Sequence, residues 1–153
     1  MSRAKATTTT NSEAEANRRL EQVERAILAD GRYPLVAFDF LHRGLQRATQ
    51  RVHGSAEREA GAGRHVSGPE LCYALRDLAF DTWGTLAVCV LRHWRVRRTR
   101  DFGEMVFLLV KLGLMGAQPS DRIEDFDDVF EFDDAFADYP ISLPCGSAVP
   151  DGV

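Results

Sequence analysis

Five arginines lie within nine residues near the middle of the chain, the densest positive charge in the sequence. They are Arg92, Arg95, Arg97, Arg98 and Arg100, and no acidic residue lies among them. Guanidinium groups bind phosphate and carboxylate oxygens through paired N–H donors, so the cluster predicts a surface for an anionic partner. The same side chains could instead pair with carboxylates of their own chain, and the sequence leaves that question open.

A second basic group recurs at every fourth residue. Arg43, Arg47 and Arg51 would form a stripe along one face of a helix. The stripe is either an extension of the binding surface or an ordinary solvated helix face. Together the eight arginines are the predicted contacts for a protein, ribonucleoprotein or nucleic-acid partner.

An acidic segment occupies residues 121–138. It holds nine acidic residues and one arginine, a net charge of -8. Large apolar residues are interleaved with these acids, namely Ile123, Phe126, Val129, Phe130, Phe132 and Phe136. We expect the phenylalanines to attach the segment to the core while its carboxylates face the arginines. Each exposed ion pair would contribute only about 0 to 1 kcal/mol, so pairing would orient segments more than stabilise them.

Side chains that could perform catalysis are present but poorly grouped. The motifs of nucleophilic hydrolases, zinc proteases, phosphate-binding loops and dinucleotide-binding folds are absent. The weakest hypothesis is an enzyme that pairs His65 with Glu70 or Asp77. Glu70, however, also fits a helix cap with Ser67. A calcium loop starting at Asp125 lacks the ligand at position five and the glycine at position six. The sequence therefore predicts a non-catalytic protein without metal or cofactor.

Length and composition describe an ordinary globular chain. Its 153 residues suit one domain, and a net charge of -4 gives no overall attraction to nucleic acid or anionic membrane. The longest apolar window, 105–115, is too short to span a bilayer, and the N-terminus lacks the apolar core of a secretory signal. Three cysteines without C-x-x-C spacing favour neither a disulfide framework nor a zinc cluster. We expect a cytoplasmic protein in which Cys72 and Cys89 are small buried residues.

Capping signals and periodicity predict the first helices. Residues 1–11 are typical of a disordered polar tail. Ser12 opens an S-x-x-E capping box for a helix over 12–31, whose final glycine is a left-handed stop. A second helix, over 35–53, carries the arginine stripe and would end at Gly54.

Capping signals and apolar patterns also predict the later helices. Ser67 and Glu70 form a capping box for a helix that Gly84 either ends or kinks. Thr99 or Asp101 can cap the next helix, which would run to about residue 113. Its apolar residues leave scarcely any polar face: Phe102, Met105, Val106, Phe107, Leu108, Leu109, Val110 and Leu112. Such a helix should be buried nearly all round, at the centre of the core.

The predicted fold class is mainly α. Residues 32–139 would form a single compact helical domain which, with the N-terminal helix, gives about five helices, followed by a flexible tail over 140–153. Residues 64–66 and 129–132 leave open a short β pair. A winged-helix-like α+β fold is the alternative, but its acidic wing would be repelled by phosphate.

Four segments carry a resemblance to a known group of proteins. They are RYPLVAFDFLHRGL, RHVSGPELCYALRDLAFDTWG, HWRVRRTRDFGEMVFLLVKLGLM and DRIEDFDDVFEFDDAF. Together they resemble a small uncharacterised family from planctomycetes and verrucomicrobia, over about residues 32–137. That family has no assigned activity, cofactor or catalytic residue, so the resemblance implies one domain here and nothing about chemistry.

The leading functional hypothesis is a non-catalytic cytoplasmic interaction or regulatory protein. It would bind a protein or ribonucleoprotein partner through charged surfaces. The alternative is a winged-helix-type nucleic-acid-binding module that uses residues 92–100. A recognition helix needs polar and basic side chains on its outer face, whereas the helix after the cluster offers Asp101, Glu104 and Lys111 as its charges. This composition favours the first hypothesis.

Overall fold

The fold is built from helices joined by short turns. A computed structural model describes residues 7–56 and 65–137. Its elements are α1 (Thr7–Asp30), α2 (Leu35–Ala56), α3 (Gly68–Trp83), the 3₁₀ turn η1 (Gly84–Leu86), α4 (Ala87–His93), α5 (Thr99–Lys111), the 3₁₀ turn η2 (Ile123–Phe126) and the one-turn helix α6 (Phe132–Ala135). The prediction of a mainly helical domain is confirmed.

The expected β pair and the winged-helix alternative are wrong for the part of the chain that the structure describes. No strand occurs in residues 7–56 or 65–137. At the second expected strand, the backbone N–H of Val129 donates to the hydroxyl of Thr99 at 3.2 Å instead of to a neighbouring strand. This segment then enters α6, which starts at Phe132. Arg64, in the first expected strand, and the tail 140–153 lie outside the described residues.

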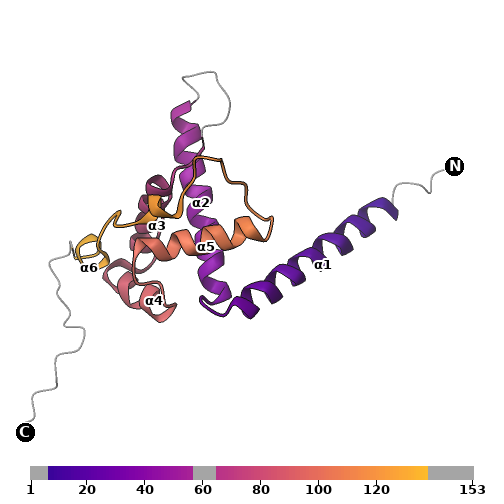
Figure 1. The fold of residues 1–153 in the computed structure, drawn as a ribbon, viewed down its shortest axis with the longest axis horizontal. Helices are drawn as coiled ribbons and strands as arrows, with labels where there is room; N and C mark the ends of the chain where they lie inside the picture. The colour runs from indigo at the N-terminus through magenta and orange to yellow at the C-terminus, as the bar shows by residue number, and fades with distance from the viewer. Residues whose placement is uncertain (1–6, 57–64, 138–153) are drawn as a thin grey trace, which may run out of the picture.

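Helix α1 begins earlier than predicted and projects from the rest of the molecule (Figure 1). Residues 7–11, expected in the tail, are helical, so the predicted capping box at Ser12 is wrong. The reason is that extending an existing helix gains one hydrogen bond per residue, so it needs no cap at a fixed place. The predicted stop is confirmed, because Gly31 has φ 70° and donates to the carbonyl of Ile27 at 3.1 Å.

Helices α2 and α3 pack closely against each other. A Cβ at Gly44 would collide with the side chain of Leu75, so the glycine allows the close approach. Helix α2 runs to Ala56, past the end expected at Gly54, because a helix-interior glycine costs only about 1 kcal/mol. Cys72 of α3 is fully buried as predicted. The prediction that Cys89 is buried is wrong, because this residue is exposed on α4.

The capping box at Ser67 forms as predicted. Its N–H donates to the Glu70 carboxylate at 2.9 Å, and its hydroxyl oxygen accepts from the Glu70 N–H at 3.4 Å. At the other end of α3, Gly84 has φ 56°, a left-handed conformation in which helix α3 ends. The chain passes through η1 into α4, so Gly84 separates two helices.

Helix α5 lies across α2 and carries the acidic segment on one side (Figure 1). Phe102 and Met105 are buried in the core, and a Cβ at Gly103 would lie 2.8 Å from Cγ of Phe126. The predicted attachment of the acidic segment is confirmed by its buried phenylalanines, Phe126, Phe132 and Phe136. The predicted all-round burial of α5 is wrong for its second half, because residues 106–110 are only half-buried.

Thr99 connects α5 to the acidic segment. Its side chain is 1% exposed, its hydroxyl donates to the carbonyl of Phe126 at 2.6 Å, and the same oxygen accepts from Val129. Two backbone groups of the acidic segment are therefore satisfied by one side chain. A buried group that loses its partner costs about 1–3 kcal/mol.

Thr99→Val keeps the shape of the side chain and removes this bridge. We expect the free energy of unfolding, measured by urea denaturation, to fall by about 1–3 kcal/mol. Thr99→Ser keeps the hydroxyl and removes one methyl group, so its loss should be nearer 1 kcal/mol. A valine variant as stable as the natural protein would contradict the role of the hydroxyl.

Candidate interaction surface

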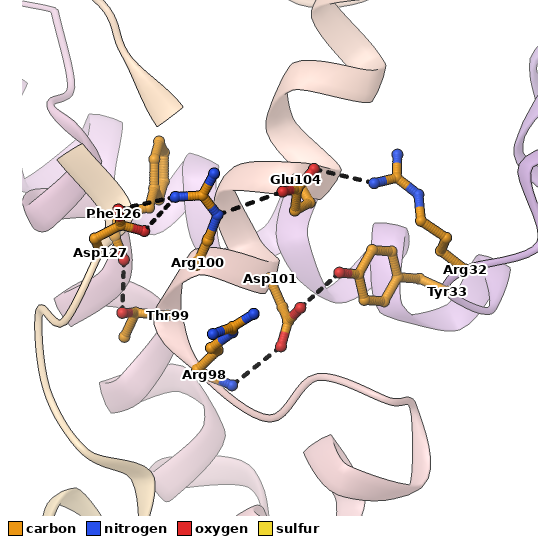
Figure 2. Close-up of polar contacts among 9 residues, drawn as sticks. All are labelled: Arg32, Tyr33, Arg98, Thr99, Arg100, Asp101, Glu104, Phe126 and Asp127. Atoms are coloured by element: carbon orange, nitrogen blue, oxygen red, sulfur yellow. Dashed lines mark hydrogen bonds and ion pairs between the residues drawn. The ribbon is translucent and has the colours of Figure 1, made fainter. Parts of the chain in front are cut away.

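The loop that carries the arginine cluster is fixed by Asp101. One carboxylate oxygen accepts the backbone N–H of Arg97 at 2.8 Å and of Arg98 at 3.1 Å, and the other accepts the Tyr33 hydroxyl at 2.7 Å (Figure 2). Burial, together with this bond, raises the pKa of the Tyr33 phenol. The carboxylate thus caps α5, as predicted, and ties its start to the α1–α2 connection.

Arg95 has a structural role at the end of α4. Its φ is 66°, a left-handed conformation that is uncommon for any residue with a Cβ. The N–H of Val96 bonds to the carbonyl of Leu91 at 2.9 Å, and the N–H of Arg95 bonds to the carbonyl of Arg92 at 2.9 Å. This is a Schellman motif, in which a glycine is usual at the left-handed position. The Arg95 guanidinium donates to the carbonyl of Gly31 at 3.2 Å.

Substitutions at Arg95 should follow backbone preference. Arg95→Gly should be as stable as the natural protein or more so, whereas Arg95→Val should lose about 1–2 kcal/mol in thermal or urea unfolding. Arg97, which has no positive φ, is the matched control. There, valine should be tolerated at least as well as glycine. Equal stability of the two Arg95 variants would contradict the motif.

Two arginines of the cluster point at the acidic segment. Arg92 pairs with Asp133 of α6 at 2.7 Å. Arg100 donates to both carboxylate oxygens of Asp127 at 2.8 Å (Figure 2). The predicted internal pairing is therefore found for these two side chains. The hydrogen bond that Arg100 donates to Asp127 raises the pKa of the Arg100 guanidinium.

Ion pairs continue from Arg100 along the edge of α5. Its Nε lies 3.5 Å from a carboxylate oxygen of Glu104, which also pairs with Arg32 at 3.0 Å (Figure 2). Arg32 in turn pairs with Asp30 at 2.9 Å, and this hydrogen bond lowers the pKa of the Asp30 carboxyl. The chain of charges links the end of α1, the α1–α2 connection, α5 and the acidic segment.

The side chains of Arg97 and Arg98 remain available for contacts with a partner. Both side chains are exposed, and within residues 7–56 and 65–137 neither guanidinium has a hydrogen-bond or ion-pair partner. Their backbone is held by Asp101 while their charges face solvent. Of the predicted cluster, these two residues alone present cations without an internal acceptor in the described chain.

The arginine stripe on α2 faces α3. Arg47 pairs with Asp81 at 2.6 Å, and Arg51 pairs with Asp77 at 2.8 Å. Sequence reasoning missed these partners, although Asp77 and Asp81 have the same four-residue spacing as the two arginines. The first arginine pairs with the second aspartate because the helices run antiparallel. Arg43, by contrast, is exposed and has no ion pair among the residues described.

Asp77 makes the α2–α3 contact sensitive to acid. Burial raises the pKa of its carboxyl, but hydrogen bonds from Arg76 and Arg51 outweigh that effect and lower it below 3.8. A carboxyl with a lowered folded-state pKa stabilises the fold above its unfolded pKa, about 3.9, and loses that contribution as the pH falls through the folded value.

We therefore expect stability, followed by urea unfolding, to decrease between about pH 5 and pH 3. Asp77→Asn should be less stable at neutral pH and should show a shallower decrease. Asp39→Asn, an exposed change on α2, is the control and should follow the natural protein. Parallel pH curves for Asp77→Asn and the natural protein would contradict the assignment.

The residues of the enzyme hypothesis do not come together as predicted. His65 bonds through Nε2 to Asp121 at 3.0 Å, not to Glu70 or Asp77. The hydroxyl of Ser67 donates to Glu70 at 2.9 Å as part of the helix cap. No group of three or more His, Cys, Asp or Glu side chains able to hold a metal ion occurs in the described ranges. No helix in those ranges is long and apolar enough to cross a membrane.

Known proteins give no further guidance. Comparison of the chain with family models, curated proteins and solved structures finds no match. The resemblance to the planctomycete and verrucomicrobial family therefore stays a prediction. The functional argument rests on the geometry of the chain itself.

Proposed function

We propose that this chain is a non-catalytic cytoplasmic interaction protein that binds a protein or ribonucleoprotein partner, with Arg97 and Arg98 as its main contacts. The supporting observation is the loop before α5, where Asp101 fixes two backbone amides and leaves two guanidinium groups in solvent. A loop that is ordered in advance loses little conformational entropy on binding. The partner surface would offer carboxylates to this pair.

The charges around the pair favour a protein surface over a nucleic acid. Arg98, Arg100, Asp127 and Asp128 line one shallow hollow, so charges of both signs lie together there. A protein surface can offer both signs in return, whereas phosphates of a nucleic acid would meet the two aspartates as like charges. A ribonucleoprotein would accordingly be contacted through its protein component.

The nucleic-acid alternative has less support. Helix α5, the expected recognition helix, buries Phe102 and Met105 in the core and packs against α2, α3 and η2. Two free arginines could make about two phosphate contacts. The slope of log affinity against log salt would then be about -2 or shallower, whereas five contacts would give about -4.

The decisive experiment is affinity purification from the native cell with the full chain as bait, with and without nuclease. We expect a stoichiometric protein partner that survives nuclease treatment. Replacing both Arg97 and Arg98 with Ser should weaken binding of the purified partner at least tenfold, because each charged contact is worth about 1.5–3 kcal/mol. Arg43→Ser, which removes an exposed arginine on α2, should bind like the natural protein.

Three outcomes would count against this function. Recovery that depends on intact nucleic acid would favour the alternative. A partner that binds the double variant normally would place the interface elsewhere. Equal weakening by Arg43→Ser would indicate attraction to net charge rather than a defined contact.

A further inference from the structure

Three aromatic rings cluster where α2, the end of α3 and the end of α4 meet. The ring centroid of Phe40, on α2, lies 5.3 Å from that of Trp83 and 5.7 Å from that of Trp94. The two tryptophan rings contact each other edge to face, with centroids 5.3 Å apart. Phe40 is almost completely buried, whereas both tryptophans are only half-buried among the described residues. The cluster therefore has a covered side and an outer side that these residues leave partly open to solvent.

Two exposed aliphatic residues flank this cluster. Leu86, in η1, follows Trp83 by three residues and is 57% exposed within the described chain. Val36 precedes Phe40 by one turn of α2 and is 50% exposed there. Helix α4 and the start of α2 lie at the same end of the molecule (Figure 1). Single exposed apolar residues are ordinary, but a group beside half-buried tryptophans is typical of a surface for a protein partner. We call Val36, Trp83, Leu86 and Trp94 the tryptophan patch.

The tryptophan patch adjoins the loop that presents Arg97 and Arg98. Arg97 follows Trp94 by three residues, so their Cα atoms are at most about 11 Å apart. The guanidinium of Arg95, between them, donates to the carbonyl of Gly31 at 3.2 Å and so holds the loop beside the α1–α2 connection, just before Val36. Apolar surface and cationic surface are therefore within reach of one short segment of a partner.

We propose that the partner of this chain presents a short segment in which large apolar side chains adjoin acidic ones. The apolar side chains would cover the tryptophan patch, and the acidic ones would accept N–H groups from Arg97 and Arg98. Acidic residues are required because neither guanidinium has an acceptor among the described residues. Tryptophan and arginine are the residues that most often carry the binding energy of a protein interface. The inference rests on the proposed function, because it keeps the two arginines as contacts and adds the apolar part of the same site.

Selection of phage-displayed random peptides on the full chain tests this inference. We expect the enriched peptides to combine aromatic or aliphatic residues with aspartate or glutamate. The tightest peptide, made synthetically, should bind Leu86→Gln at least about fivefold more weakly in fluorescence anisotropy, because this change removes an apolar contact and leaves the net charge unaltered. Leu20→Gln is the matched control, since Leu20 on α1 is also 57% exposed, and it should bind the peptide normally.

The outcomes separate this inference from the proposed function. Peptides that bind Leu86→Gln normally, but not the variant with Ser at both Arg97 and Arg98, would overturn the apolar contact and leave the proposed function standing. Enrichment of acidic peptides without apolar residues, or of no peptide, would overturn the inference as well, and affinity purification would still test the proposed function. Equal weakening by Leu20→Gln would indicate general adhesion to apolar surface and would also overturn it.

Discussion

The hydroxyl of Thr99 holds the acidic segment on helix α5, and much of the remaining arrangement depends on that contact. The Thr99 side chain is almost completely buried, and it satisfies a carbonyl and an N–H of the segment at once. The absence of a side chain at Gly103 lets the ring of Phe126 lie against the helix. Asp127 consequently reaches Arg100.

Charge pairing then divides the arginines into two groups with different roles. Arg47, Arg51, Arg92 and Arg100 have carboxylate partners, and Arg95 holds a helix end. Exposed pairs of this kind add little stability, since water screens them and long side chains lose freedom. Their value lies in orienting segments that the buried phenylalanines hold in place. Of the five-arginine cluster, the pair Arg97 and Arg98 remains for a partner.

Helix α5 shows how one composition can serve two environments. Its first turns need apolar residues because they contact α3 and η2, and Phe102 is almost completely buried there. Its second half has similar residues but only one covered side. The described residues therefore leave apolar surface of this half partly exposed.

The sequence by itself determined the local structure: the helical class, the cap at Ser67 and the stop at Gly31. These depend on residues within a few positions of one another, so spacing and residue type suffice. Tertiary structure alone decided which arginines are paired, that Cys89 is exposed, and that the second half of α5 is only half-buried. Each of those outcomes depends on groups far apart in the chain, such as Thr99 with Phe126, which periodicity within one segment does not specify.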